Sequence, residues 1–383
     1  MTQAEFGAFI HFTQPAVSQL EHDGPAIYDV RVLRRVAKAL NVPLALLIVG
    51  SDEEADLKRR QFLEAGAVAV ATTVGPGHAE TVPVGMKVGI ADVGRITCSI
   101  NEIHELQLLV GGDRLCAVAD HQVRYVEQLL DQGEYSDTVG KALTSAAAEM
   151  QTAAGWVFYD AGRYVEARHY YAGAAQAAAA AGDGIAAGHA WINACLLSYR
   201  EGSRPREGVK LAEAAQLAAR RDGGPKLRAL AAIREAEAHS AIGDQSAMVA
   251  AVSRAHRAYE STRGHDPEYF AHLSEGQFSG LTGLAFMRGG RHREAAGYLE
   301  EAIDKSVSYP RDHLAWQIRL AQNSIRSGAI ADGCALLVNN FGVIGAVASA
   351  RLREALGEIA SDLRPHTAVA EVREFLGMWT SCW

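Results

Sequence analysis

Two glutamines near the N-terminus have the chemistry needed to read a DNA sequence. Gln14 and Gln19 lie in one short stretch, and a glutamine amide can donate and accept hydrogen bonds at the same time. This combination matches the major-groove edge of adenine. Gln3, Thr13 and Ser18 carry shorter polar groups that suit phosphate oxygens. We therefore predict that these five residues contact DNA.

Short helices would have to position these side chains. Thr2 and Glu5 have the spacing of a capping box, which predicts a helix through residue 10. Thr13 can cap a second helix over 14–21, and apolar residues at helical spacing predict a third helix over 32–40. Two short helices joined by a tight connection can present the second one to the major groove.

Residues 2–7 (TQAEFG) and 13–21 (TQPAVSQLE) resemble the helix-turn-helix of the XRE family of phage-repressor-like regulators. The resemblance implies a DNA-binding domain over residues 1–50 that reads an operator with the 13–21 helix. It also implies a homodimer, because symmetric operators require two heads. The family's first helix is missing before Thr2, so we expect that the natural start lies upstream or that the body or a dimer mate orders the head.

The charge of this head leaves a second interpretation open. Residues 1–50 contain four basic and four acidic side chains, so their attraction to phosphate should be modest. The same polar residues can instead form the solvated face of a helical bundle.

Five glycines mark an internal repeat in the rest of the chain. Gly162, Gly202, Gly243, Gly290 and Gly328 follow one another at intervals of 40, 41, 47 and 38 residues. A small residue stands seven positions before each glycine, and a large apolar residue stands nine positions after it. The repeating unit is predicted to be a helix, a tight turn and an antiparallel second helix, and such units stack into a solenoid.

Residues 155–167 (GWVFYDAGRYVEA) and 283–295 (GLAFMRGGRHREA) resemble the tetratricopeptide (TPR) repeat. A weaker unit is centred on Gly133, and residues 352–379 can supply helices that cap the stack. Together with the head, this arrangement is similar to actinobacterial two-domain regulators and to Gram-positive regulators whose TPR domains bind peptide pheromones. In that group the repeat body dimerises and binds the signal.

The predicted repeats also indicate a ligand groove. In a TPR-like stack, residues nine, six and two positions before each glycine lie on the concave face. These positions contain more arginine than acid, and a guanidinium group binds carboxylate or phosphate with two hydrogen bonds. The predicted ligand-binding residues are Asn193, Arg200, Arg234, Arg288, Arg319, Gln322 and Arg326. The alternative is that the arginines only solvate helix C-termini, where their charge is also favourable.

No motif of an enzyme or of a metal site is found in the sequence. There is no GxxxxGK[ST] phosphate loop and no HExxH zinc motif, and residues 75–77 (GPG) lack the third glycine of a dinucleotide loop. Glu268 and His272 share a helical face, but one pair is a poor metal site, so we interpret both as surface residues. We expect no catalytic residue, no cofactor and no metal.

The composition indicates a helical, cytoplasmic protein that does not enter membranes. Of 383 residues 49% are hydrophobic, alanine runs such as 177–181 favour helix, and the formal charge is −8. No apolar run is long enough to span a bilayer, and five widely spaced cysteines fit a reducing compartment. Arg59 and Arg60 resemble an export signal but lie too far from the N-terminus.

We therefore predict an all-α fold with an XRE-like domain over 1–50, a linker with an amphipathic helix over 51–87 and a TPR-like domain over 88–383. The predicted function is a DNA-binding transcriptional regulator that responds to a peptide or a small anionic effector. The alternative is a TPR protein-interaction module whose head no longer binds DNA.

Overall fold

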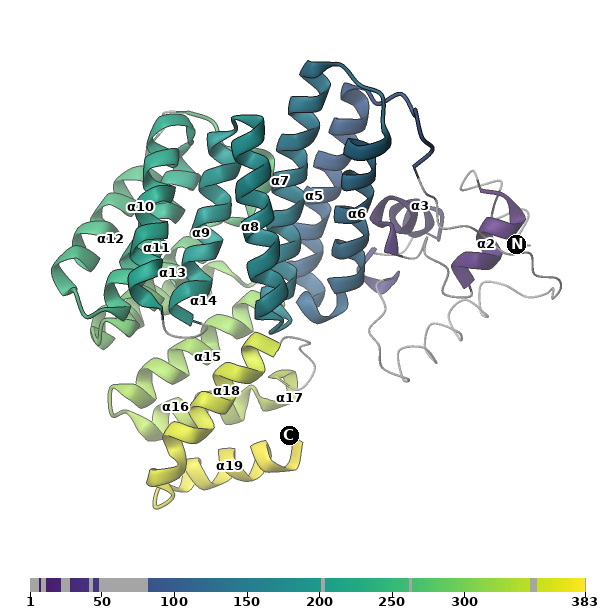
Figure 1. Cartoon of the computed structure of the whole chain (residues 1–383). Coiled ribbons are helices and arrows are strands. Elements are labelled where there is room, and N and C mark those ends of the chain that lie inside the picture. The colour runs from purple at the N-terminus through teal and green to yellow at the C-terminus, as the bar shows by residue number, and fades with distance from the viewer. Residues whose placement is uncertain are drawn as a thin grey trace.

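The structure is a computed structural model that describes residues 7, 12–21, 28–40, 44–47, 82–200, 204–261, 264–344 and 350–382. This part of the chain is helical and contains no β-strand; Lys87 and Glu134 form an isolated β-bridge. The predicted all-α helical-repeat solenoid is confirmed (Figure 1). No helix in the described ranges is both long and apolar enough to cross a membrane.

The repeat body is built from helix pairs that stack side by side. Its first elements are α5 (Ile90–Val110) and α6 (Cys116–Gln132). The pairs that follow are α7 (Asp137–Asp160) with α8 (Tyr164–Ala181), α9 (Gly184–Arg200) with α10 (Pro205–Asp222), α11 (Pro225–Ala241) with α12 (Gln245–Tyr259), α13 (Glu275–Arg288) with α14 (His292–Lys305) and α15 (Pro310–Arg326) with α16 (Ile330–Asn339).

Four of the predicted glycine turns lie in the described residues, and each connects the two helices of a pair. Gly162, Gly243, Gly290 and Gly328 have φ values between +72° and +97°, which side chains other than glycine rarely adopt. Gly202 lies outside the described residues. The weaker unit at Gly133 also marks a helix end, since Gly133 follows α6, but its φ is −79°.

Small residues on the first helix of a pair receive large residues from the second, as predicted. A Cβ atom on Gly155 of α7 would lie 2.5 Å from the ring of Tyr171 on α8. A Cβ atom on Gly283 of α13 would lie 2.8 Å from the side chain of Leu299 on α14. Close contact between helices at these positions therefore requires glycine.

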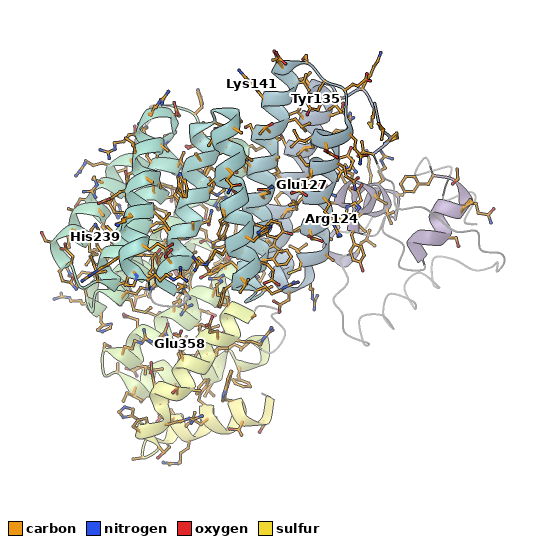
Figure 2. All side chains as sticks on the ribbon, viewed as in Figure 1. Arg124, Glu127, Tyr135, Lys141, His239 and Glu358 are labelled. Carbon is orange, nitrogen blue, oxygen red and sulfur yellow. The ribbon has the colours of Figure 1, made fainter. Side chains whose placement is uncertain are left out.

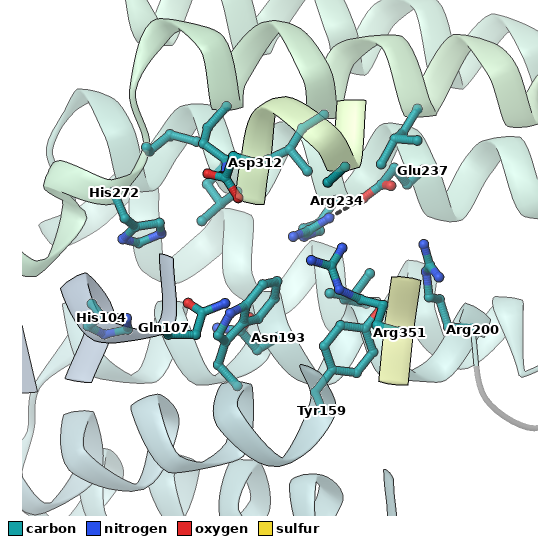
Figure 3. A pocket seen from close by; sticks show the side chains of 18 of the residues that line it. His104, Gln107, Tyr159, Asn193, Arg200, Arg234, Glu237, His272, Asp312 and Arg351 are labelled. Atoms are coloured by element: carbon teal, nitrogen blue, oxygen red, sulfur yellow. Dashed lines mark hydrogen bonds and ion pairs between the residues drawn. The ribbon is translucent and has the colours of Figure 1, made fainter. Parts of the chain in front are cut away.

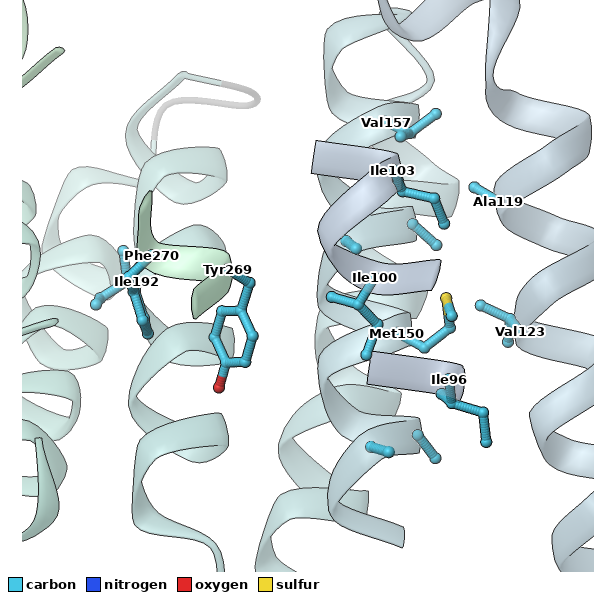
Figure 4. Packing of buried hydrophobic residues seen from close by; sticks show 14 of the residues in the cluster. Ile96, Ile100, Ile103, Ala119, Val123, Met150, Val157, Ile192, Tyr269 and Phe270 are labelled. Atoms are coloured by element: carbon cyan, nitrogen blue, oxygen red, sulfur yellow. The ribbon is translucent and has the colours of Figure 1, made fainter. Parts of the chain in front are cut away.

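The largest hydrophobic cluster runs through α5, α6 and α7 and continues into the later helix pairs. Ile96 and Ile100 of α5 pack with Val123 of α6 and Met150 of α7 (Figure 4). The same cluster includes Phe270 from the 3₁₀ helix Glu268–His272, which connects α12 and α13. Residues far apart in the chain thus share one core.

The C-terminal helices cover the end of the stack. The elements after α16 are α17 (Phe341–Ile344), α18 (Ala350–Leu363) and α19 (Ala370–Cys382). Phe375 of α19 and Leu356 of α18 are buried in a cluster with Leu337 of α16, as expected of capping helices. α18 also contacts α7, so a helix at the C-terminal end of the solenoid lies against the first helix of its first pair.

The described part of the head consists of α2 (Gln14–Glu21), α3 (Val30–Leu40) and the short 3₁₀ helix Leu44–Leu47. Val17 of α2 packs against Val32 and Val36 of α3. The predicted helices over 14–21 and 32–40 are therefore present, and the second begins two residues earlier. The helix predicted to run through residue 10 and the amphipathic helix of the linker lie outside the described residues, apart from Gly7 and residues 82–87.

Candidate functional site

The first helices of the repeats surround a cavity of about 80 Å³ (Figure 3). Its wall is formed mainly by α7, α9, α11, α13 and α15, together with side chains of α5 and α18. The polar and charged side chains in this wall are His104, Gln107, Thr152, Trp156, Tyr159, His189, Asn193, Arg200, Arg234, Glu237, His272, Gln277, Arg311, Asp312, Trp316 and Arg351. A cavity so rich in charge suits a charged or strongly polar ligand better than an apolar one.

One carboxylate in this wall binds two arginines. Glu237 is fully buried, lies 2.8 Å from Nη1 of Arg288 and also pairs with Arg234. The hydroxyl of Tyr199 donates a third hydrogen bond to Glu237. Burial alone would raise the pKa of Glu237, but the two guanidinium groups hold it below its usual value. One negative charge here faces two positive charges.

A second carboxylate joins the two ends of the solenoid. Asp160, at the C-terminal end of α7, accepts hydrogen bonds from Arg311 of α15, from Nε of Arg351 on α18 at 2.9 Å and from the backbone nitrogen of Gly112 at 2.8 Å. Burial would raise the pKa of Asp160, but Arg311 and Arg351 lower it to about 2. The group is therefore ionised at neutral pH.

Three histidine rings stack at the other side of the cavity. The ring centroids of His104 and His272 lie 5.3 Å apart, and His189 stacks on Tyr269 at 5.8 Å. Nδ1 of His189 lies 2.8 Å from Glu149. The interpretation of His272 as a surface residue is therefore wrong. Its helix turns the ring inward onto His104, whereas Glu268 is exposed as predicted.

Burial dominates the chemistry of these histidines. It holds the pKa of His104 well below the usual value, and His272 and His189 lower it further. Burial also lowers the pKa of His272 to about 4. Within the described ranges, no group of three histidine, cysteine, aspartate or glutamate side chains is placed to hold a metal ion.

A second cavity, of about 160 Å³, adjoins the first and shares Arg200 and Leu284 with it. Four arginines line it: Arg200, Arg288, Arg319 and Arg326. The acids in its wall, Glu354 and Glu358, come from α18, where Figure 2 labels Glu358. Arginine thus outnumbers acid in the walls of both cavities.

All seven predicted ligand-binding residues line one of these two cavities. Asn193, Arg200 and Arg234 line the first, and Arg200 lines the second together with Arg288, Arg319, Gln322 and Arg326. Several of them also have protein partners. The amide of Asn193 donates to the His189 carbonyl at 3.0 Å, and Arg326 lies 3.4 Å from Asp362.

Other cavity residues were not predicted, although part of the signal is present in the sequence. Four of them lie one helical turn before a predicted groove position: His189, Leu230, Gln277 and Ala315. Extending the groove register by four residues would have found this set. His104 and Gln107 of α5 and Arg351 of α18 lie outside the repeats, so the repeat register contains no signal for them.

The predicted DNA-contacting residues are described only in part. Thr13 and Gln14 are exposed at the start of α2, and Ser18 is half-buried. Gln3 and the side chain of Gln19 lie outside the described residues. The exposed Gln14 leaves its amide accessible to a partner.

The head is attached to the body through α3. Arg31 pairs with Asp29 and lies 3.9 Å from the ring centroid of Tyr125 on α6, and Arg34 pairs with Glu102 on α5. These two arginines therefore bind groups of the protein.

No protein-family model matches the chain, and no curated protein matches it.

Proposed function

We propose that this protein is a DNA-binding transcriptional regulator whose helical body binds an anionic effector. The observation that carries the proposal is the pair of adjoining cavities, whose walls contain more arginine than acid although the whole chain has a formal charge of −8. Positive charge collected at a concave site in an acidic protein is expected to attract an anion. The effector class is a small acid or a peptide with a free carboxylate.

The head supports the DNA-binding half of the proposal. α2 is short, its start exposes Thr13 and Gln14, and Val17 on its other face packs against α3. A helix held on one face with glutamine exposed near its start has the arrangement used in the major groove. Recognition of a symmetric operator then requires a homodimer, which we propose acts in the cytoplasm.

α5 connects the two parts. Glu102 of α5 pairs with Arg34 of the head, while His104 and Gln107 of the same helix line the first cavity. A ligand that moves α5 therefore acts on the contact that holds α3. A response to the ligand requires contacts that differ between the bound and the free protein, and α5 makes contacts with both the cavity and the head.

Fluorescence anisotropy with DNA from upstream of the protein's own gene tests the proposal. Gln14→Ala should weaken specific binding by about 1–3 kcal/mol, because one base contact is lost. Gln176→Ala is the matched control, since Gln176 is exposed on α8, outside the head. Equal affinity of both variants for a DNA that the wild-type protein binds would refute the role of α2 as the reading helix.

The rival function is a TPR-like scaffold with a head that binds no DNA. It is favoured by the position of Arg31 and Arg34, whose charges are paired with acids of the protein. Absence of any salt-dependent retardation of the upstream DNA by the wild-type protein would support this rival.

A further inference from the structure

Arg319 of α15 is a buried guanidinium group without a carboxylate partner among the residues that the structure describes. The residue is only 4% exposed. Its Nη1 donates to Oε1 of Gln322 at 2.7 Å, but its Nη2 is buried and has no hydrogen-bond partner. Burial, with the nearby charges of Arg200 and Arg351, lowers the pKa of Arg319 to about 9. A buried cation in this state is unfavourable unless an anion joins it.

Arg200 increases the excess of positive charge. It lines both cavities, its Nε is buried without a hydrogen-bond partner, and no described carboxylate forms an ion pair with it. Of the charged neighbours of Arg319, Arg200 has the largest effect on its pKa. The two guanidinium groups thus repel each other across the second cavity.

The other two arginines in this wall, Arg288 and Arg326, form ion pairs within the protein. Arg288 pairs with Glu237, which also pairs with Arg234. Arg326 lies 3.4 Å from Asp362 and 3.8 Å from Glu358. The two acids in the wall accept hydrogen bonds from neutral groups: Glu354 accepts one from the hydroxyl of Tyr164, and Glu358 accepts one from the amide of Gln322 at 3.1 Å. Glu358 forms its ion pair with Arg326 and not with Arg200 or Arg319. Arg200 and Arg319 are therefore the two arginines of this wall that form no ion pair with a described carboxylate, although the charge of Glu358 acts to raise the pKa of both.

We propose that the second cavity binds a phosphate group between Arg200 and Arg319. Two guanidinium groups that form no ion pair with the protein match the double negative charge of a phosphate, and each can direct two N–H groups at its oxygens. A cavity of about 160 Å³ holds such a compact dianion, free or as part of a small organic phosphate. This inference rests on the proposed function only for the role of the ligand as an effector.

Isothermal titration calorimetry with inorganic phosphate at constant ionic strength tests the proposal on the full chain. Wild-type protein should bind phosphate, and Arg319→Gln should weaken the affinity about tenfold or more, because one of the two guanidinium groups is lost. Arg200→Gln should weaken it similarly and gives the answer if Arg319→Gln does not fold. Arg221→Gln is the control, since Arg221 lies on the exposed end of α10 and should leave binding unchanged.

A second measurement separates a binding residue from a structural one. Without phosphate, Arg319→Gln should melt at or above the wild-type temperature, because a buried charge that forms no ion pair is removed. At one phosphate concentration, phosphate should raise the melting temperature of the wild-type and Arg221→Gln proteins more than that of Arg319→Gln.

The proposal is overturned if the wild-type protein does not bind phosphate, or if the Arg200 and Arg319 variants bind it as tightly as Arg221→Gln does. Comparison with the DNA assay keeps the two proposals separate. Loss of DNA affinity in Gln14→Ala without any phosphate binding refutes the phosphate site alone. Phosphate binding that depends on Arg319, in a protein that does not bind DNA, refutes the regulator alone.

A synthetic organic phosphate distinguishes the two sources of the ligand. Glycerol 3-phosphate that binds at least as tightly as inorganic phosphate, with the same dependence on Arg319, supports a phosphate carried by a small molecule. Binding of inorganic phosphate alone supports a free ion.

Discussion

Replacing Asp160 with asparagine should destabilise the protein by about 3–5 kcal/mol. Asparagine keeps the shape of the side chain but removes one negative charge from beside the two guanidinium groups of Arg311 and Arg351. Asp160 is fully buried, and Arg311 is only 5% exposed, so water can replace little of the lost interaction. The loss is a large part of the 5–15 kcal/mol that typically stabilises a folded protein.

Urea denaturation at pH 7 followed by circular dichroism measures this loss. Glu207→Gln is the control, because Glu207 forms an ion pair with Arg204 at the surface and its loss should leave stability almost unchanged. A destabilisation of Asp160→Asn below about 1 kcal/mol would refute the reasoning, since a buried ion pair cannot be broken so easily. In the wild type, the contribution of Asp160 should be present above pH 3.8 and be lost as the pH falls toward 2.

Further perturbations test the histidines, the helix contacts and the attachment of the head. Between pH 7.5 and 5 the protein should lose about 2 kcal/mol of its free energy of unfolding through His272 alone. The pKa of His272 is about 4 in the folded protein and 6.5 in the unfolded chain, so the unfolded chain binds the proton first as the pH falls. A free energy of unfolding in urea that does not change with pH would contradict this. Gly155→Ala should cost about 1–3 kcal/mol through overlap with a neighbouring ring, whereas Gly297→Ala on the open face of α14 should gain up to about 1 kcal/mol in the same assay. A stable Gly155→Ala would disprove the tight contact. Tyr125→Ala removes the ring below Arg31, so hydrogen exchange in α3 should accelerate while exchange in α13 stays constant; unchanged protection of α3 would show that the ring does not hold the head.

The repeat architecture could be predicted because backbone geometry restricts the residue type at each turn. Four described repeat glycines adopt a left-handed conformation, and glycine at 155 and 283 permits contacts that any side chain would prevent. A glycine at the turn and a small residue seven positions before it recur from unit to unit, so they appear in the sequence as a period. The same period predicted which residues of the first helices face the groove, and the arginines among them do line cavities.

The rest of the candidate site could not be predicted because it depends on contacts between distant parts of the chain. Arg351 belongs to a capping helix, and His104 to a helix before the repeats, so neither has a place in the repeat pattern. The sequence also does not show which acids pair with the arginines. Only the folded structure shows that Arg234 forms an ion pair with Glu237 whereas Arg319 is not paired with an acid.

The ion pairs of Asp160 have a consequence for the order of folding. Repeat proteins usually fold from contacts between neighbours, so their folding can begin anywhere and their terminal units unravel first. Asp160 instead binds partners 151 and 191 residues further along the chain. Such contacts require the intervening helix pairs to be in place, because closing so long a loop costs entropy that only the assembled stack can offset. The ends should therefore dock last, and once joined they should unfold together with the middle of the solenoid in a single cooperative step.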